Sequence, residues 1–129
     1  MYYDSRFISK INDEHYIVLS EGGMNDGAFY IARYDELKTE FNDIYIPSNN
    51  EHIYKDKKCI YFAEWLYIIN TQSAKIEKYI YNIDKLFFLT DCIVCVIKKR
   101  NRYDEFIKVN MTDLSVETIG NLFFRNMFR

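Results

Sequence analysis

Two cysteines three residues apart, Cys92 and Cys95, have the spacing in this chain that is most suggestive of chemistry. Redox C-x-x-C pairs place one sulfur at a helix N-terminus, where amide dipoles lower its pKa, and structural metal sites add a second pair of ligands. Here the run is Cys-Ile-Val-Cys-Val-Ile, residues 92–97, and its four β-branched residues favour a strand. Because residues three apart in a strand point to opposite faces, we expect Cys95 to lie with Ile93 and Ile97, away from Cys92. The sequence predicts a buried strand with free thiols.

The other candidates for catalysis or ligand binding also lack their usual companions. Cys59 stands alone, and neither His15 nor His52 has a second ligand at metal-site spacing. No serine or cysteine lies in a nucleophile-type context. The glycine-rich stretch 20–29 lacks the Gly-Lys-Ser/Thr ending of a phosphate-binding loop, so we expect a loop between two strands that can also serve in binding. The sequence therefore predicts a protein that is not an enzyme and uses no metal and no cofactor.

Composition limits the class of protein further. With 129 residues, 49% of them apolar and 28% charged, the chain suits one globular domain spanning 1–129. A net charge of −2 does not indicate the basic surface that binds the phosphate backbone, so we expect no nucleic-acid partner. No run of eighteen apolar residues occurs, and the N-terminus has no basic region followed by an apolar one. We therefore expect no membrane partner and a cytoplasmic location. The chain has three cysteines, an odd number without the spacing of a disulfide framework, which also fits free thiols in a reducing compartment.

Three stretches of the chain share one pattern: 14–41, 57–79 and 91–119. In each, strand-like apolar runs alternate with turns, and a short apolar segment (6–11, 43–46 or 85–89) precedes it. Each unit thus has four expected strands, with the short preceding segment as the first. When the units are aligned on their third strands, Phe29, Leu66 and Phe106 fall at the same position. Just before the turns that follow these strands come Arg33, Asn70 and Asn110. The prediction is an all-β fold, an antiparallel meander of about three four-stranded, propeller-blade-like units.

Two segments allow a different secondary structure. Between residues 73 and 87, apolar side chains also fall at helical spacing behind Ser73, a possible N-cap. An α+β fold with one helix there is the alternative to the all-β fold. The C-terminal segment 120–129 can likewise be a strand that closes the sheet or a helix that caps the core.

Candidate recognition residues are aromatic and acidic. Trp65 lies in the run Phe-Ala-Glu-Trp-Leu-Tyr-Ile, next to Glu64, and large rigid aromatic side chains often dominate binding energy. Acidic side chains near predicted strand ends or loops are Glu21, Asp26, Glu51, Asp56, Glu64, Asp91, Asp104 and Glu105. Together these can form an electronegative patch that steers a basic partner. The candidate partner-binding residues are Trp65, Glu64, Glu21, Asp26, Asp104 and Glu105.

A small, aromatic-rich, slightly acidic chain without a catalytic motif resembles the bacterial immunity proteins of contact-dependent and other polymorphic toxin systems. The resemblance lies in general character along the whole chain, so it transfers no site residue. It implies tight, non-catalytic binding of a cognate toxin domain, for instance a nuclease, and a basic toxin would complement the acidic residues. The predicted function is therefore that of an immunity or inhibitor protein.

Two other functions fit the repeated units. A propeller-like carbohydrate-binding module is the main alternative, although the positions aligned with Trp65 are Ala28 and Glu105. A structural subunit that completes a six-unit ring as a dimer is the other. The oligomeric state stays open.

Overall fold

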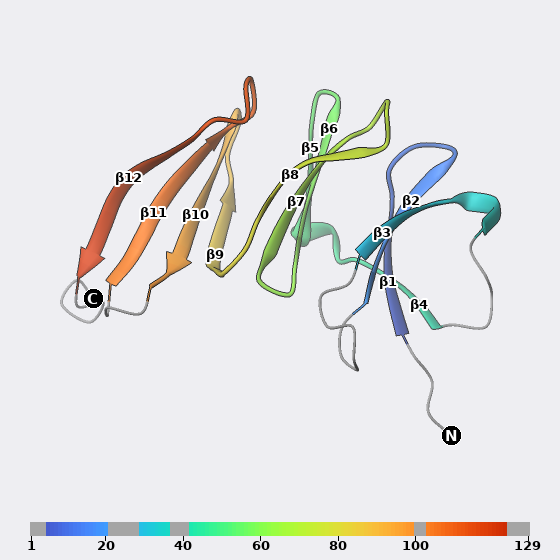
Figure 1. Cartoon of the computed structure of the whole chain (residues 1–129), viewed down its shortest axis with the longest axis horizontal. Helices are drawn as coiled ribbons and strands as arrows, with labels where there is room; N and C mark the ends of the chain where they lie inside the picture. Colours follow the sequence, from blue (N-terminus) through green and yellow to red (C-terminus); the bar gives the residue numbers. More distant parts are fainter. Residues whose placement is uncertain (1–4, 21–28, 37–41, 100–102, 124–129) are drawn as a thin grey trace.

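The computed structural model describes residues 5–20, 29–36, 42–99 and 103–123. Within these ranges the chain forms twelve β-strands and two short 3-10 segments. The strands make three four-stranded sheets that stand side by side in chain order (Figure 1). The prediction of an all-β fold with three blade-like units is confirmed.

The second and third sheets are antiparallel meanders whose strands pair in chain order. The strands of the second sheet are β5 (Glu51–Tyr54), β6 (Lys57–Phe62), β7 (Trp65–Asn70) and β8 (Lys75–Ile80). Those of the third sheet are β9 (Ile83–Phe88), β10 (Cys92–Lys98), β11 (Tyr103–Asn110) and β12 (Val116–Phe123).

The helical alternative for residues 73–87 is wrong, because this segment contains β8 and most of β9. Exposed and partly buried side chains alternate along β8 with a period of two, which is the period of a strand that faces the core on one side. Asn82, with φ 67°, separates the two strands, since this left-handed conformation ends regular structure. In the C-terminal segment β12 extends to Phe123, and 124–129 lie outside the described residues.

The first sheet departs from the expected order. Its strands are β1 (Ser5–Lys10), β2 (His15–Ser20), β3 (Phe29–Arg33) and β4 (Asn42–Tyr45). They lie in the order β3-β2-β1-β4, and β4 runs parallel to β1.

The segment 43–46 was expected to begin the second unit, and this prediction is wrong. The segment instead completes the first sheet, where Ile44 pairs with Phe7 and the Ile46 amide donates to the Ile8 carbonyl at 3.2 Å. Pro47 and the 3-10 turn η3 (Ser48–Asn50) then lead into β5, which begins the second sheet. After β3 the chain forms the 3-10 turn η2 (Tyr34–Glu36), and 37–41 lie outside the described residues.

One backbone hydrogen bond recurs in all three sheets. In each sheet, the amide that follows the third strand donates to the carbonyl of an acidic residue in the turn before the second strand. The three bonds are Tyr34 to Glu14 at 2.7 Å, Thr71 to Asp56 at 2.8 Å and Met111 to Asp91 at 3.2 Å. The donors directly follow the three aligned residues at the ends of the third strands, so the predicted alignment of the units is confirmed at the backbone level.

Two apolar layers hold the sheets together, and the second sheet is buried on both faces. Towards the first sheet it contributes Ile60, Tyr67 and Ile69. Towards the third sheet it contributes Cys59, Leu66 and Ile68. Each large aliphatic side chain buried in this way stabilises the fold by about 1.5–3 kcal/mol. No helix in the described part of the chain is long and apolar enough to cross a membrane.

Candidate functional site

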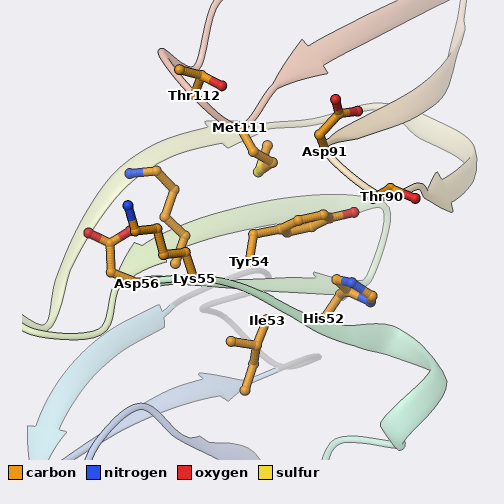
Figure 2. Close-up of a pocket in the computed structure, with 10 residues that line it drawn as sticks. His52, Ile53, Tyr54, Lys55, Asp56, Thr90, Asp91, Met111 and Thr112 are labelled. Carbon is orange, nitrogen blue, oxygen red and sulfur yellow. The ribbon is translucent and has the colours of Figure 1, made fainter.

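A cleft of about 540 Å³ lies between the second and third sheets (Figure 2). Residues 52–57, from β5, the β5–β6 turn and the start of β6, form one wall. Thr90 and Asp91 from the β9–β10 turn and Met111 and Thr112 after β11 form the other. The cleft therefore lies at the end of the array where turns of both sheets meet.

Tyr54 forms the base of this cleft and joins the two sheets. Its side chain is 8% exposed, and its hydroxyl donates to the Leu89 carbonyl at 2.6 Å and lies 3.2 Å from the Cys92 carbonyl. Desolvation by burial raises the pKa of Tyr54 to about 12, so the phenol is neutral at physiological pH. This bond links β5 to the β9–β10 turn, so it ties the two walls of the cleft together at its base.

Aromatic and sulfur contacts complete the base. The His52 ring stacks on Phe88 with centroids 5.3 Å apart and an interplanar angle of 17°, and its centroid lies 4.4 Å from that of Tyr54. Met111 is 8% exposed, and its sulfur accepts a contact from the Cys59 thiol at 3.9 Å. The base is therefore apolar and made of side chains from both sheets.

The charged groups at the rim differ in how they are paired. Lys57 donates to Glu77 at 2.8 Å, and this hydrogen bond raises the pKa of Lys57. Asp56 and Asp91 form no ion pair with any residue of the described ranges. The rim thus offers carboxylates to a ligand, while one of its lysines is already neutralised.

A second candidate surface surrounds Trp65, which is partly buried at the start of β7. The centroid of its ring lies 5.6 Å from that of Tyr79 and 5.4 Å from that of Tyr81. These tyrosines are 53% and 60% exposed. We call Trp65, Tyr79 and Tyr81 the aromatic platform.

The platform is supported from behind and bordered by a shallow groove. Trp65 stacks on the fully buried Tyr67 with centroids 6.0 Å apart, and Phe29 of the first sheet packs edge-on against Tyr67 at 4.9 Å. Beside Tyr79 and Tyr81 lies an open cleft of about 470 Å³ that Lys98 also lines. The Trp65 ring therefore has a buried support, and a solvent-accessible hollow lies beside the two tyrosines.

The predicted acidic residues do not form one patch. Glu64 accepts from Lys98 at 2.9 Å, and Glu105 pairs with Lys99 at 3.3 Å. Asp104 is only 5% exposed. These three residues lie at the opposite end of the strands from Asp56 and Asp91, as the meander order requires.

The remaining acidic candidates lie elsewhere. Glu51 binds the Ser9 hydroxyl and lies 3.6 Å from the Lys58 ammonium. Glu21 and Asp26 fall outside the described residues, as do the glycines of the 20–29 loop. The described candidates therefore lie at separate places on the molecule rather than on one surface.

All three cysteines are buried and free. Cys95 belongs to the core with Ile93 and Ile97, which confirms the predicted face of β10. Desolvation raises the pKa of Cys59 and of Cys95 to about 12, so neither thiol is available as a thiolate at neutral pH. Within the described residues, no group of three or more His, Cys, Asp or Glu side chains is placed to hold a metal ion.

Sequence reasoning missed Tyr79 and Tyr81 as members of the site. The available signal was their spacing of two residues, which puts both on one face if the segment is a strand. The cross-strand pairing of Tyr67 with Tyr79 is what places that face on the side of Trp65. The competing helical pattern in the same segment obscured it.

No family model matches the chain, and neither the curated proteins nor the solved structures include a significant match.

Proposed function

We propose that this chain is a non-catalytic immunity or inhibitor protein that binds a cognate toxin domain. The observation that carries the proposal is the aromatic platform, in which Tyr79 and Tyr81 are more than half exposed while both pack against Trp65. Tyr and Trp side chains are enriched at the energetic centres of protein interfaces because they contribute a large contact area and lose little conformational entropy.

The rigidity of the platform supports this role. Tyr67 is 1% exposed and lies directly behind Trp65, so the indole ring has a fixed support before any partner arrives. Binding to side chains that are already ordered avoids the entropic cost of immobilising them. A high affinity from a small surface, as an inhibitor requires, is consistent with this arrangement.

The charges beside the platform suit a basic partner. The pair formed by Glu64 and Lys98 has side chains that are 54% and 40% exposed, and exposed pairs of this kind contribute only about 0–1 kcal/mol. A cationic group of a partner can therefore replace Lys98 at little cost. The net charge of −2 assists the approach of such a partner.

A growth-competition assay tests the proposal. A strain that lacks this chain is mixed with its parental strain, and survival is compared after complementation with wild type, Tyr79→Ala or Tyr81→Ala. We expect wild type to protect and each variant to protect less. The reason is that each variant should weaken toxin binding about thirtyfold, which corresponds to the 2 kcal/mol typical of an interface hot spot.

Tyr45→Ala is the matched control, because Tyr45 is 66% exposed but lies on the first sheet, away from the platform. Circular dichroism must show that all variants fold. Equal survival with and without the chain would refute the proposed function, and full protection by both platform variants would refute the role of the platform.

Carbohydrate binding is the second candidate, because exposed stacked rings such as Tyr79 and Tyr81 can also pack on the apolar face of a sugar. A glycan array distinguishes the two functions. Binding of one sugar class by wild type, lost in Tyr81→Ala, would favour the carbohydrate function, and absence of any signal would eliminate it.

A further inference from the structure

The cleft in Figure 2 lies at the opposite end of the strands from the aromatic platform and is a separate site. We propose that it binds an aliphatic cation, an ammonium or guanidinium group on a short apolar stem. Such a group is carried by a lysine or arginine side chain of a protein and by a free polyamine. The proposal does not depend on the proposed function.

The base of the cleft suits the apolar stem of this ligand. Tyr54 and Met111 are each 8% exposed and belong to the core between the second and third sheets. The Tyr54 hydroxyl already donates to a backbone carbonyl, so the base presents no unsatisfied polar group to an aliphatic chain. Methionine and aromatic surfaces pack well against methylene groups.

The rim suits the cationic head. The Met111 amide donates to the Asp91 carbonyl at 3.2 Å, which fixes Asp91 beside Met111, as Figure 2 shows. The exposed hydroxyls of Thr90 and Thr112 flank it and can accept hydrogen bonds. An ammonium or guanidinium group has several donors and no acceptor, so carboxylate and hydroxyl oxygens are its natural partners.

The positive charges of the cleft do not cancel this preference. Lys57 is paired with Glu77 at 2.8 Å. Lys55 lies beside Asp56, on the side of the cleft away from Asp91 (Figure 2). Asp91 therefore remains a rim carboxylate that forms no ion pair with any lysine in the described part of the chain.

The cleft is also formed in advance. The bond from the Tyr54 hydroxyl to Leu89 and the stacking of His52 on Phe88 hold both walls in place. A ligand therefore needs no rearrangement of the protein, and the cost of binding is mainly that of immobilising the ligand itself.

Titrations followed by nuclear magnetic resonance test the proposal on the full chain. The probes are blocked arginine amide, spermidine as a free polyamine, and blocked citrulline amide as the neutral isostere of arginine. We expect the arginine probe to shift the Met111 methyl and Asp91 amide signals in a saturable way, and citrulline to bind at least tenfold more weakly.

Asp91→Asn is expected to weaken the binding of arginine about tenfold, the effect of losing one charge-assisted hydrogen bond. Asp13→Asn is the control for net charge, because this side chain is 98% exposed and lies in the β1–β2 turn of the first sheet; it should leave binding unchanged. Tighter binding of spermidine than of arginine would identify a free polyamine as the source, and the reverse would identify a protein side chain.

Three results would overturn the proposal: shifts that map outside the cleft, equal binding of citrulline and arginine, or equal binding by Asp91→Asn and wild type. The growth-competition assay stays independent of these results, because it measures protection by the platform variants. Failure of either proposal can therefore be recognised separately.

Discussion

Removal of a single oxygen, in Tyr54→Phe, measures how strongly the second and third sheets are joined. The hydroxyl donates to the Leu89 carbonyl at 2.6 Å across the two sheets. The nearby Cys92 carbonyl keeps another donor, the Leu89 amide at 2.9 Å. Leu89 itself is 47% exposed, and we expect water to reach its carbonyl once the hydroxyl is gone. The full penalty for a buried unsatisfied group is therefore avoided, and we expect a loss of about 1 kcal/mol, the value of one neutral hydrogen bond.

Urea unfolding followed by fluorescence measures this loss as a shift of the midpoint at constant m. A loss of 1 kcal/mol corresponds to a decrease in Tm of about 4 °C for a chain of this size. Tyr79→Phe is the control, because Tyr79 is 53% exposed and its hydroxyl can be solvated in both states. Identical midpoints for wild type and Tyr54→Phe would refute the inference that this hydroxyl joins the sheets, and a loss above 3 kcal/mol would refute the expected access of water.

Three further perturbations test the fold. Ala63 has φ 50° in the β6–β7 turn, a left-handed conformation that costs alanine more than glycine. Ala63→Gly should therefore stabilise the protein by up to about 1 kcal/mol, whereas Ala32→Gly within β3 should destabilise it. Denaturant midpoints of both variants check this. Ile93→Ala should cost about 2–5 kcal/mol because Ile93 is fully buried between the second and third sheets, and an unchanged midpoint would contradict the described core. Burial raises to about 12 the pKa of four side chains, Tyr54, Tyr67, Cys59 and Cys95. The free energy of unfolding should therefore fall as pH rises from about 9 to 12, by up to about 1.4 kcal/mol per pH unit for each of these groups. The unfolded chain loses these protons first, so urea midpoints should be insensitive to these groups below pH 9 and decline above it.

The strands were predictable where the pattern of the sequence is local. The continuous apolar run of β7 and the partial alternation of apolar and polar side chains in β11, together with the turns that follow Asn70 and Asn110, gave the units and their alignment. The assignment of β4 failed because a short apolar segment carries no information about which sheet it joins. Its partner β1 is more than thirty residues away and runs parallel to it, and such pairing depends on tertiary packing rather than on a turn.

The candidate sites were predictable only in part. Trp65 stood out as the single tryptophan, but the cleft depends on contacts between sheets, such as that of the Tyr54 hydroxyl with Leu89, 35 residues away. No period in the sequence encodes a contact of this kind. Burial of Asp104 was missed for a related reason, since a position near a strand end was taken to imply exposure.

The repeat itself bears on the choice between the two proposed functions. The three sheets share a backbone hydrogen bond at equivalent positions, yet the positions aligned with Trp65 are Ala28 and Glu105, and Glu105 pairs with Lys99 instead of packing with aromatic rings. A lectin built from repeats gains avidity by repeating its sugar site in each unit. Here the backbone hydrogen bond recurs but, among the described residues, the stacked tryptophan and tyrosines of the platform do not; the exposed Tyr34, just after β3 of the first sheet, packs instead on Tyr16, with centroids 5.8 Å apart. Such an arrangement favours a single protein partner over a periodic glycan.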